Sequence, residues 1–154
     1  MSTIENGSQE ESVSRSRARS RRSAKAAGSS FERLVADYLA VVVDDRIDRR
    51  VKTGAKDKGD IAGVRVHGQR VVLEAKDYGG RLLPGPWLKE AQTEADNDGA
   101  PIGIVIAKRR GTAKPEDQFV LMELRDLAFL LTGNTPISGK IEAAPEVLQT
   151  LSEA

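Results

Sequence analysis

Cysteine is absent from this 154-residue sequence, and His67 is its only histidine. Without cysteine, the chain cannot form a disulfide, a thiolate zinc site or a cysteine nucleophile. A single imidazole also excludes zinc sites built on several histidines, and a Ser-His-Asp triad would have to use His67. Any metal held by the side chains would therefore have oxygen ligands, which favours Mg²⁺ or Mn²⁺.

Aromatic residues are also few, at 4%, while hydrophobic residues make up 39% of the chain. This composition is typical of a globular domain whose core consists mainly of aliphatic side chains. No apolar run approaches the roughly 18–20 residues that a membrane-spanning helix needs, and the N-terminus does not resemble a signal peptide. We therefore expect a cytoplasmic protein of one domain that has no membrane partner.

Charge is unevenly distributed along the chain. Residues 1–27 contain six basic and three acidic residues, a net charge of +3, whereas the remaining chain contains 18 basic and 20 acidic residues. Because residues 1–27 are rich in Ser, Arg and Glu and lack an apolar period, they predict a disordered basic arm. Such an arm either keeps the protein in solution or binds a polyanion such as a nucleic acid.

An amphipathic helix is predicted to begin at Gly28-Ser29-Ser30. Six apolar residues follow at the spacing of one helical face: Phe31, Leu34, Val35, Tyr38, Leu39 and Val42. Glu32 lies about 100° around the helix from Phe31, and hence at the edge of this buried stripe. Two interpretations of Glu32 stay open: a residue that lines a cleft, or the partner of Ser29 in a helix capping box.

The segment from Asp60 to Lys76, DIAGVRVHGQRVVLEAK, predicts two short strands joined by a tight turn at His67-Gly68. On the second strand, Glu74 and Lys76 are neighbours on one face, because successive side chains of a strand point to opposite faces. Burying charge in an apolar strand is costly. These two residues therefore indicate a chemical site rather than part of the core.

The register of this hairpin decides whether Asp60 joins Glu74. Regular pairing across a two-residue turn places Asp60 opposite Ala75, on the wrong face. One extra residue accommodated at Gly63 would shift the pairing, so that Asp60 faces Glu74. Since glycine inside a strand pattern often marks such a bulge, we predict a bulge at Gly63.

The remaining chain supplies further strands, helices and basic residues. A strand is predicted at 47–52, followed by a loop that carries Lys56 and Lys58. A helix that begins at Pro86 and stops at Asn97-Asp98-Gly99 comes next. It is followed by a buried strand at 102–107, a strand at 118–123 and a helix at 124–131. Residues 133–154 predict a weakly structured extension with one weak helix at 145–151. The order α-β-β-β-α-β-β-α favours an α/β domain over residues 28–132, with a mixed central sheet flanked by helices.

Taken together, these motifs resemble the PD-(D/E)xK nuclease superfamily, and are most similar to archaeal-type and phage Holliday-junction resolvases. The resemblance rests on Phe31-Glu32-Arg33 in the first helix, Asp60 in the hairpin, Glu74-Ala75-Lys76 at the end of the next strand, and Gln92 in the second helix. It covers roughly residues 28–131. The sequence departs from the family pattern in having Gly59, and not proline, before Asp60.

The resemblance implies a restriction-endonuclease-like αβββαβ core and a Mg²⁺-dependent endonuclease, with Mn²⁺ as a substitute. Its substrate would be branched DNA, in particular four-way junctions, cut by a homodimer in the cytoplasm of a bacterium or a phage-infected host. The implied catalytic residues are Glu32, Asp60, Glu74, Lys76 and Gln92, and the implied metal ligands are Asp60, Glu74, the Ala75 carbonyl and Glu32. The expected DNA-binding residues are Arg33, Arg49, Arg50, Lys56, Lys58, Lys108, Arg109 and Arg110.

Two alternatives remain at this point. A nicking, repair or restriction-type nuclease of the same superfamily would act on linear or damaged DNA, since a fold does not fix a substrate. A non-catalytic nucleic-acid-binding protein would use Glu74 and Lys76 as an ion pair and Glu32 as a helix cap.

Overall fold

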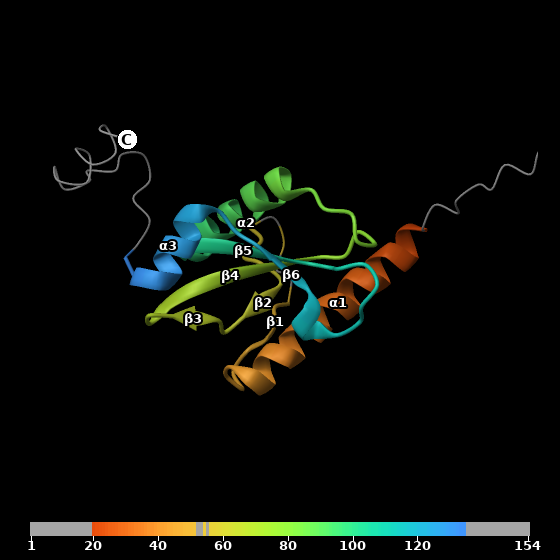
Figure 1. Cartoon of the computed structure of the whole chain (residues 1–154), viewed down its shortest axis with the longest axis horizontal. Helices are drawn as coiled ribbons and strands as arrows, with labels where there is room; N and C mark the ends of the chain where they lie inside the picture. The colour runs from red at the N-terminus through yellow and green to blue at the C-terminus, as the bar shows by residue number, and fades with distance from the viewer. Residues whose placement is uncertain (1–19, 52–53, 55, 135–154) are drawn as a thin grey trace, which may run out of the picture.

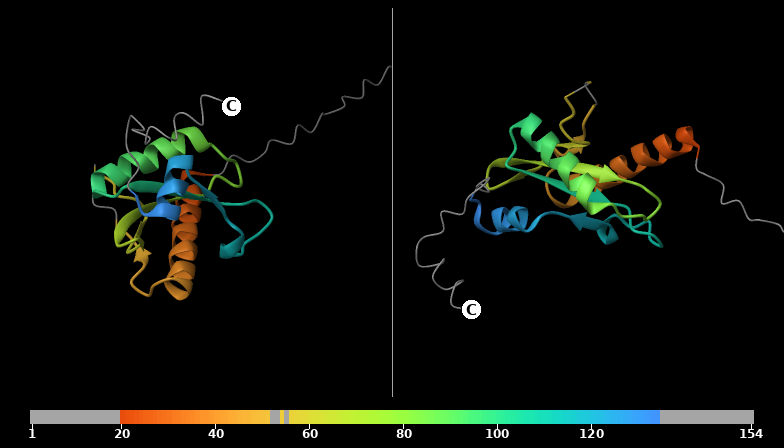
Figure 2. Two further views of the ribbon diagram at one scale, coloured as in Figure 1. Left: turned by 60° about the vertical axis from the view of Figure 1, so that its left-hand side comes forward. Right: turned by 90° about the horizontal axis from the view of Figure 1, so that it is seen from above.

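A computed structural model describes residues 20–51, 54 and 56–134 of the chain. They form an α/β domain in which one mixed sheet is covered by helices on both faces (Figures 1 and 2). This confirms the predicted fold class. No helix in this described part is long and apolar enough to cross a membrane. Most of the predicted arm and the whole of the predicted helix at 145–151 lie outside the described residues.

The sheet has six strands, and its central pair runs in parallel. The strands are β1 (Asp48–Arg49), β2 (Ile61–Ala62), β3 (Arg65–Val66), β4 (Gln69–Lys76), β5 (Ile102–Ala107) and β6 (Phe119–Leu121). Their order is β1-β2-β4-β5-β6, and β3 pairs with the start of β4. Because β4 and β5 are parallel, they end at the same edge of the sheet, where Lys76 lies beside Ala107. That edge carries the candidate site.

Helices α1 (Arg21–Val42) and α3 (Leu124–Thr132) cover one face of the sheet, and α2 (Pro84–Asp98) covers the other. On β4, Val71, Leu73 and Ala75 belong to the apolar cluster under α1 and α3. Val72 instead packs against Ala95 of α2. The alternation of β4 therefore directs Glu74 and Lys76 towards α2, as their shared spacing predicted.

Helix α1 begins at Arg21, and the predicted start at Gly28 is wrong. Ser20 caps the helix, since its hydroxyl oxygen accepts a hydrogen bond from the Ser23 N–H. The residues between are exposed and mostly good helix formers, so they extend the helix without contributing the apolar period that sequence reasoning relied on. Ser29 lies inside the helix, and the capping-box interpretation of Glu32 is therefore wrong as well.

The predicted bulge at Gly63 is confirmed. Val66 pairs with Gln69, whereas Ile61 pairs with Leu73, so the first strand holds one more residue than its partner. Gly63 adopts a φ of 87°, and a Cβ there would lie 2.5 Å from the Arg46 carbonyl oxygen. The shift brings Asp60 level with Glu74, because the register continues one residue beyond Ile61.

Helix α2 approaches the sheet unusually closely. At Gly103 of β5, a Cβ would lie 2.1 Å from the carbonyl oxygen of Ala91. The helix starts at Pro84 rather than Pro86, and it ends as predicted at Gly99, whose φ of 64° closes the helix. Its buried positions include two acidic residues, Glu94 and Asp98, which the apolar pattern did not suggest.

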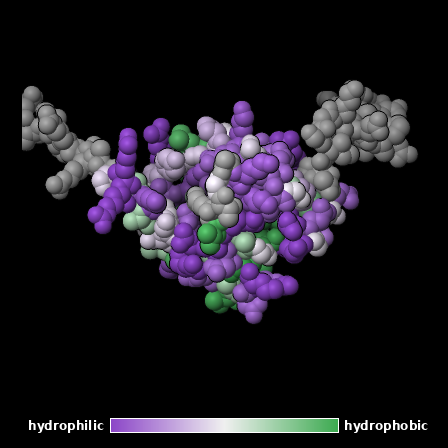
Figure 3. Space-filling view, turned by 180° about the vertical axis from the view of Figure 1, so that it is seen from behind, coloured by the Kyte–Doolittle hydropathy of each residue, from purple (hydrophilic) through white to green (hydrophobic). Residues whose placement is uncertain are grey.

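The other predicted elements differ from the structure mainly in length. Strand β5 has the predicted limits, and all of its residues are buried. Strands β1 and β6 are shorter than predicted, and part of the expected 47–52 strand lies outside the described residues. The face shown in Figure 3 is mostly hydrophilic, with apolar residues in small separate groups.

Substitution of Gly63 by alanine tests the bulge. Gly63→Ala should lower the free energy of unfolding by more than about 2 kcal/mol, because a positive φ strains alanine and the new methyl group must displace a backbone carbonyl. Gly68→Ala is the matched control, since Gly68 also has a positive φ but has nothing within 4 Å of the added atom. Urea unfolding of the two variants measures the difference, and equal losses would contradict the contact at Gly63.

Candidate active site

A cavity of about 640 Å³ opens at the carboxyl end of β4. Four segments line it: α1, the residue before β2, the end of β4 and the loop that follows. Its lining residues are Ala24, Gly28, Glu32, Asp60, Glu74, Ala75, Lys76, Asp77, Tyr78 and Gly79. We call it the acidic cavity. The structure thus brings together every residue that the sequence proposed as a metal ligand, together with Lys76.

Glu32 enters the cavity from α1 and is held by Arg49. The Arg49 guanidinium donates from Nε and Nη2 to Glu32 Oε2, at 3.1 and 2.7 Å. Glu32 is only 8% exposed, so this pairing compensates a carboxylate that has lost most of its water. Sequence reasoning could not choose between Arg49 and Arg50. In the structure, Arg49 lies beside the acidic cavity and Arg50 turns away to Asp98.

Asp60 lies against β4 and is almost completely buried. Its Oδ2 accepts a hydrogen bond from the Ala75 N–H at 3.0 Å, and its own N–H donates to the Leu73 carbonyl oxygen. These contacts fix the carboxylate next to Glu74. The bulge at Gly63 makes this position available to Asp60.

Glu74 is a buried residue that lines the acidic cavity and also lies close to Glu90 and Glu94 of α2. Lys76 Nζ donates to its Oε1 at 2.8 Å, while no group in the described residues donates to its Oε2. Burial, followed by repulsion from Asp60, raises the pKa of Glu74 to about 9, and Lys76 offsets only part of this effect. Without a bound metal ion, Glu74 therefore carries a proton at neutral pH.

Lys76 is an ammonium group between two carboxylates. Its Nζ donates to Glu74 Oε1 and also to Glu90 Oε2, at 2.7 Å. Burial acts to lower the pKa of Lys76, but the hydrogen bonds to Glu74 and Glu90 outweigh it and raise the pKa above its usual value. Lys76 therefore stays charged at neutral pH.

Helix α2 contributes two carboxylates that sequence reasoning missed. Oxygens of Glu74, Glu90 and Glu94 all lie within 4.8 Å of one another, a grouping that could hold a metal ion. Glu94 is 5% exposed, and burial raises its pKa. One signal could have found this residue: Glu94 stands next to Ala95 in the apolar stripe of a helix, where a carboxylate needs a partner.

Gln92, in contrast, does not join the cluster. Its side-chain amide donates to Asp96 Oδ1 at 3.1 Å, on an exposed part of α2. Gln92 is two residues from Glu90 and from Glu94, which places it about 200° around the helix from both. The expected catalytic glutamine is therefore not supported, and Glu90 and Glu94 occupy the side of α2 that faces β4.

The other predicted DNA-binding residues are spread around the fold. Lys56 is exposed in the loop before β2, and Arg33 is exposed and donates to Asp48 Oδ1 at 2.6 Å. Lys108, Arg109 and Arg110 follow β5. Of these, Lys108 donates to the Thr112 carbonyl oxygen, while Arg110 is exposed. None of these five residues lines the acidic cavity.

A divalent cation fits the residues of this site. Glu74 Oε2 and Glu94 Oε2 are both buried, and neither accepts a hydrogen bond from the described residues. Two neighbouring buried carboxyl groups of this kind need either a shared proton or a cation. The ligand chemistry, all oxygen, is that of Mg²⁺ and Mn²⁺.

No family model, curated protein or solved structure matches this chain.

The raised pKa of Glu74 predicts how stability depends on pH without metal. The folded protein holds this proton up to about pH 9, whereas an unfolded Glu releases it near 4.5, so stability should fall as the pH rises between these values. Glu74→Gln removes this dependence, and its amide can still accept from Lys76 and donate to Glu94. In EDTA at about pH 8, the variant should be more stable than the wild type by about 1–3 kcal/mol.

Urea unfolding at several pH values measures this effect, with the exposed Glu116→Gln as the matched control. Added Mg²⁺ should stabilise the wild type but not Glu74→Gln. A variant that is less stable than the wild type throughout this range would contradict the assigned proton.

Proposed function

We propose that this protein is a divalent-metal-dependent DNA endonuclease of the PD-(D/E)xK type. One observation carries the proposal: Glu32, Asp60, Glu74, the Ala75 backbone and Lys76 line a single cavity. They come from α1, the segment before β2 and the end of β4. With β2 and β3 counted as one strand interrupted by the bulge, the elements from α1 to β5 follow the αβββαβ order that the resemblance implies. If these residues had no shared function, their meeting in one cavity would be a coincidence, because they are distant in the sequence.

Asp60 and Glu74 would hold the metal, with the Ala75 carbonyl as a further ligand and Glu32 at a greater distance. Glu94 and Glu90 extend the same carboxylate group from the α2 side. When bound, Mg²⁺ or Mn²⁺ supplies polarisation of the scissile phosphate and a lowered pKa for water. The overall reaction adds water across one P–O bond and leaves a phosphate monoester and a hydroxyl group.

Lys76 contributes positive charge rather than a base. Because it stays protonated, it cannot take a proton from the attacking water at neutral pH. Its ammonium group can instead offset the negative charge that develops on the phosphate in the transition state. Glu74 and Glu90 fix its position through two hydrogen bonds.

The proposed substrate is branched DNA, in particular the four-way junction, cut by a homodimer. This part of the proposal is supported by the resemblance of Phe31-Glu32-Arg33 and Glu74-Ala75-Lys76 to junction resolvases. Cutting two strands symmetrically requires two active sites.

A non-catalytic nucleic-acid-binding protein is the second candidate. One observation favours it: Lys76 donates hydrogen bonds to both Glu74 and Glu90, and so stabilises part of the acidic cluster without a metal. It does not account for Glu94, or for Asp60 facing the same cavity. We therefore favour the nuclease.

Cleavage of a four-way DNA junction, beside a linear duplex of the same arms, tests the proposal. The wild type should make paired, symmetric nicks in the junction with Mg²⁺ and none with EDTA. Glu74→Gln should lose at least about two orders of magnitude of activity, because it removes a charged metal ligand. Equal cutting of the linear duplex would refute the junction preference alone. No cutting with Mg²⁺ or Mn²⁺, while DNA binding persists, would favour the second candidate.

The two sides of α2 give a further test of the site. Glu94→Gln should lower activity or metal affinity about 10–100-fold, the usual effect of losing a group that supports metal ligands. Gln92→Ala is the matched control on the same helix and should change activity less than about threefold, since Gln92 binds Asp96 instead. Mg²⁺-dependent cleavage rates measure both effects. A large loss in Gln92→Ala would restore the glutamine to the site and contradict the orientation of α2.

A further inference from the structure

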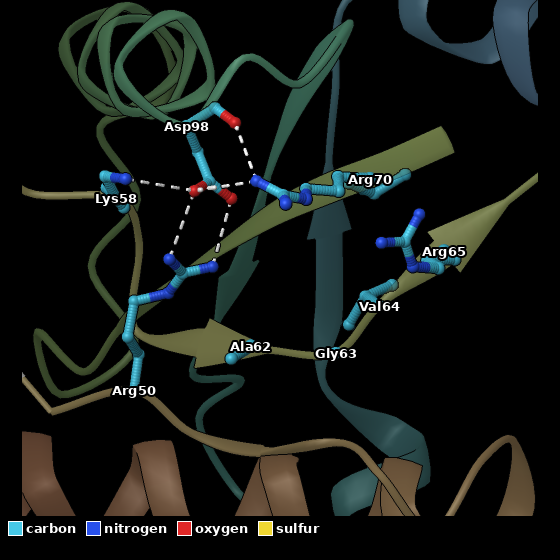
Figure 4. Close-up of a pocket in the computed structure, with 9 residues that line it drawn as sticks. Arg50, Lys58, Ala62, Gly63, Val64, Arg65, Arg70 and Asp98 are labelled. Atoms are coloured by element: carbon cyan, nitrogen blue, oxygen red, sulfur yellow. Dashed lines mark hydrogen bonds and ion pairs between the residues drawn. The ribbon is translucent and has the colours of Figure 1, made fainter. Parts of the chain in front are cut away.

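A second charged cavity, of about 350 Å³, lies near the start of β4. Arg50, Lys58, Arg65 and Arg70 supply four cations to its lining, and Asp98 at the end of α2 supplies the only carboxylate there. We call it the cationic cavity. Figure 4 shows Arg50, Lys58 and Arg70 reaching Asp98 from different segments of the chain.

Arg50 alone provides a hydrogen-bond donor for each carboxylate oxygen of Asp98. The Arg50 guanidinium donates to both of its carboxylate oxygens, at 3.2 and 3.1 Å, and the Asp98 side chain is only 4% exposed. Lys58 Nζ and Arg70 Nη1 lie farther away, each 3.6 Å from Asp98 Oδ1. The Asp98–Arg50 pair alone would fasten the end of α2 to the chain after β1.

The remaining positive charge is held less firmly, although Arg70 Nη1 also donates to the Asp98 carbonyl oxygen, at 3.3 Å. The side chain of Arg70 is 56% exposed and that of Lys58 is 41% exposed, and Arg65 Nη1 donates to the Gly68 carbonyl oxygen. The lining therefore carries three more positive charges than negative ones. Guanidinium groups gathered around a concave surface suit a phosphate, whose oxygens accept paired N–H donors.

The cationic cavity is connected to the candidate active site through Arg50. A third cavity, of about 650 Å³, is also lined by Arg50, together with Lys25, Arg33 and Arg49. This third cavity shares Gly28 and Glu32 with the acidic cavity. Shared lining residues thus link the three cavities in sequence, and the middle one is lined by four cations and by the carboxylates of Glu32 and Asp48.

We propose that the cationic cavity binds a backbone phosphate of the DNA strand whose scissile phosphate lies in the acidic cavity. This inference rests on the proposed nuclease function, and it adds Arg65, Arg70 and the orienting Asp98 to the binding surface. Arg70 and Lys76 lie six residues apart on β4, which corresponds to about 20 Å. Because neighbouring phosphates of one strand are farther apart than the 3.4 Å rise along the helix axis, this distance corresponds to a few nucleotides, fewer than about six.

Binding of a fluorescent four-way junction in EDTA tests the cavity without cleavage. The double variant Arg65→Gln/Arg70→Gln should bind at least about tenfold more weakly than the wild type, and its slope of log affinity against log salt should fall by about 2. The matched control is Lys89→Gln/Arg125→Gln, which removes the same charge from exposed residues outside the three cavities. Equal weakening by both double variants would overturn the proposal.

A scan with single uncharged methylphosphonate linkages locates the contact along the strand. For the wild type, we expect two regions of weakened binding, separated by a few nucleotides. In Arg65→Gln/Arg70→Gln, one of these regions should disappear and the other should remain. One region only, or two regions that both persist in the double variant, would overturn the proposal.

Failure of this inference can be told from failure of the proposed function. Two regions of sensitivity in a protein that never cuts DNA would keep the cationic cavity and refute the nuclease. Cleavage without a second region would keep the nuclease and refute the cavity's role. If inorganic phosphate stabilises the wild type but not the double variant, while junction binding equals that of the control, the cavity serves a free phosphate compound and not DNA.

Discussion

Burial of the Glu74 carboxyl group next to Asp60 and Glu94 is the constraint on which this site depends. Three carboxyl groups in a largely dry position repel one another, and each would be more stable in water. Lys76 relieves part of this cost through one hydrogen bond to Glu74. The rest of this free-energy cost is offset by a proton on Glu74, or by a metal cation that takes the place of that proton. The same arrangement that weakens the metal-free fold at high pH thus provides a group of carboxylates that could hold a metal ion.

Two backbone features make that arrangement fit. The bulge at Gly63 moves Asp60 onto the level of Glu74, and Gly103 lets α2 come close enough for Glu90 and Glu94 to reach β4. Neither glycine touches the carboxylates. Their role is geometric, because each occupies a place where a Cβ would collide with the backbone of another element.

Positive charge is distributed over two separate parts of the fold, as the proposed function on nucleic acid would require. Two consecutive arginines form ion pairs in different cavities. Arg49 pairs with Glu32 at the acidic cavity, and Arg50 pairs with Asp98 at the cationic cavity. Each arginine is anchored by a buried or nearly buried carboxylate. Anchoring of this kind limits the loss of side-chain entropy when a phosphate binds. A chain of nearly zero net charge can therefore still present locally positive surfaces.

Local features of the sequence determined much of this protein. Alternation placed Glu74 and Lys76 on one face of β4, a continuous apolar run defined β5, and a glycine within a strand pattern predicted the bulge at Gly63. Each of these depends on neighbours within a few residues, which the sequence displays directly. The apolar stripe of α2 also indicated which side of this helix meets the sheet. Tertiary structure alone decided which residues beside that stripe lie against Glu74, namely Glu90 and Glu94 and not Gln92. It also decided that Asp98 gathers Arg50 and Arg70, which are distant in sequence. The first turns of α1 escaped prediction because they bury no apolar stripe. Contacts between charged residues of different elements follow from the packing of whole elements, and no local pattern encodes them.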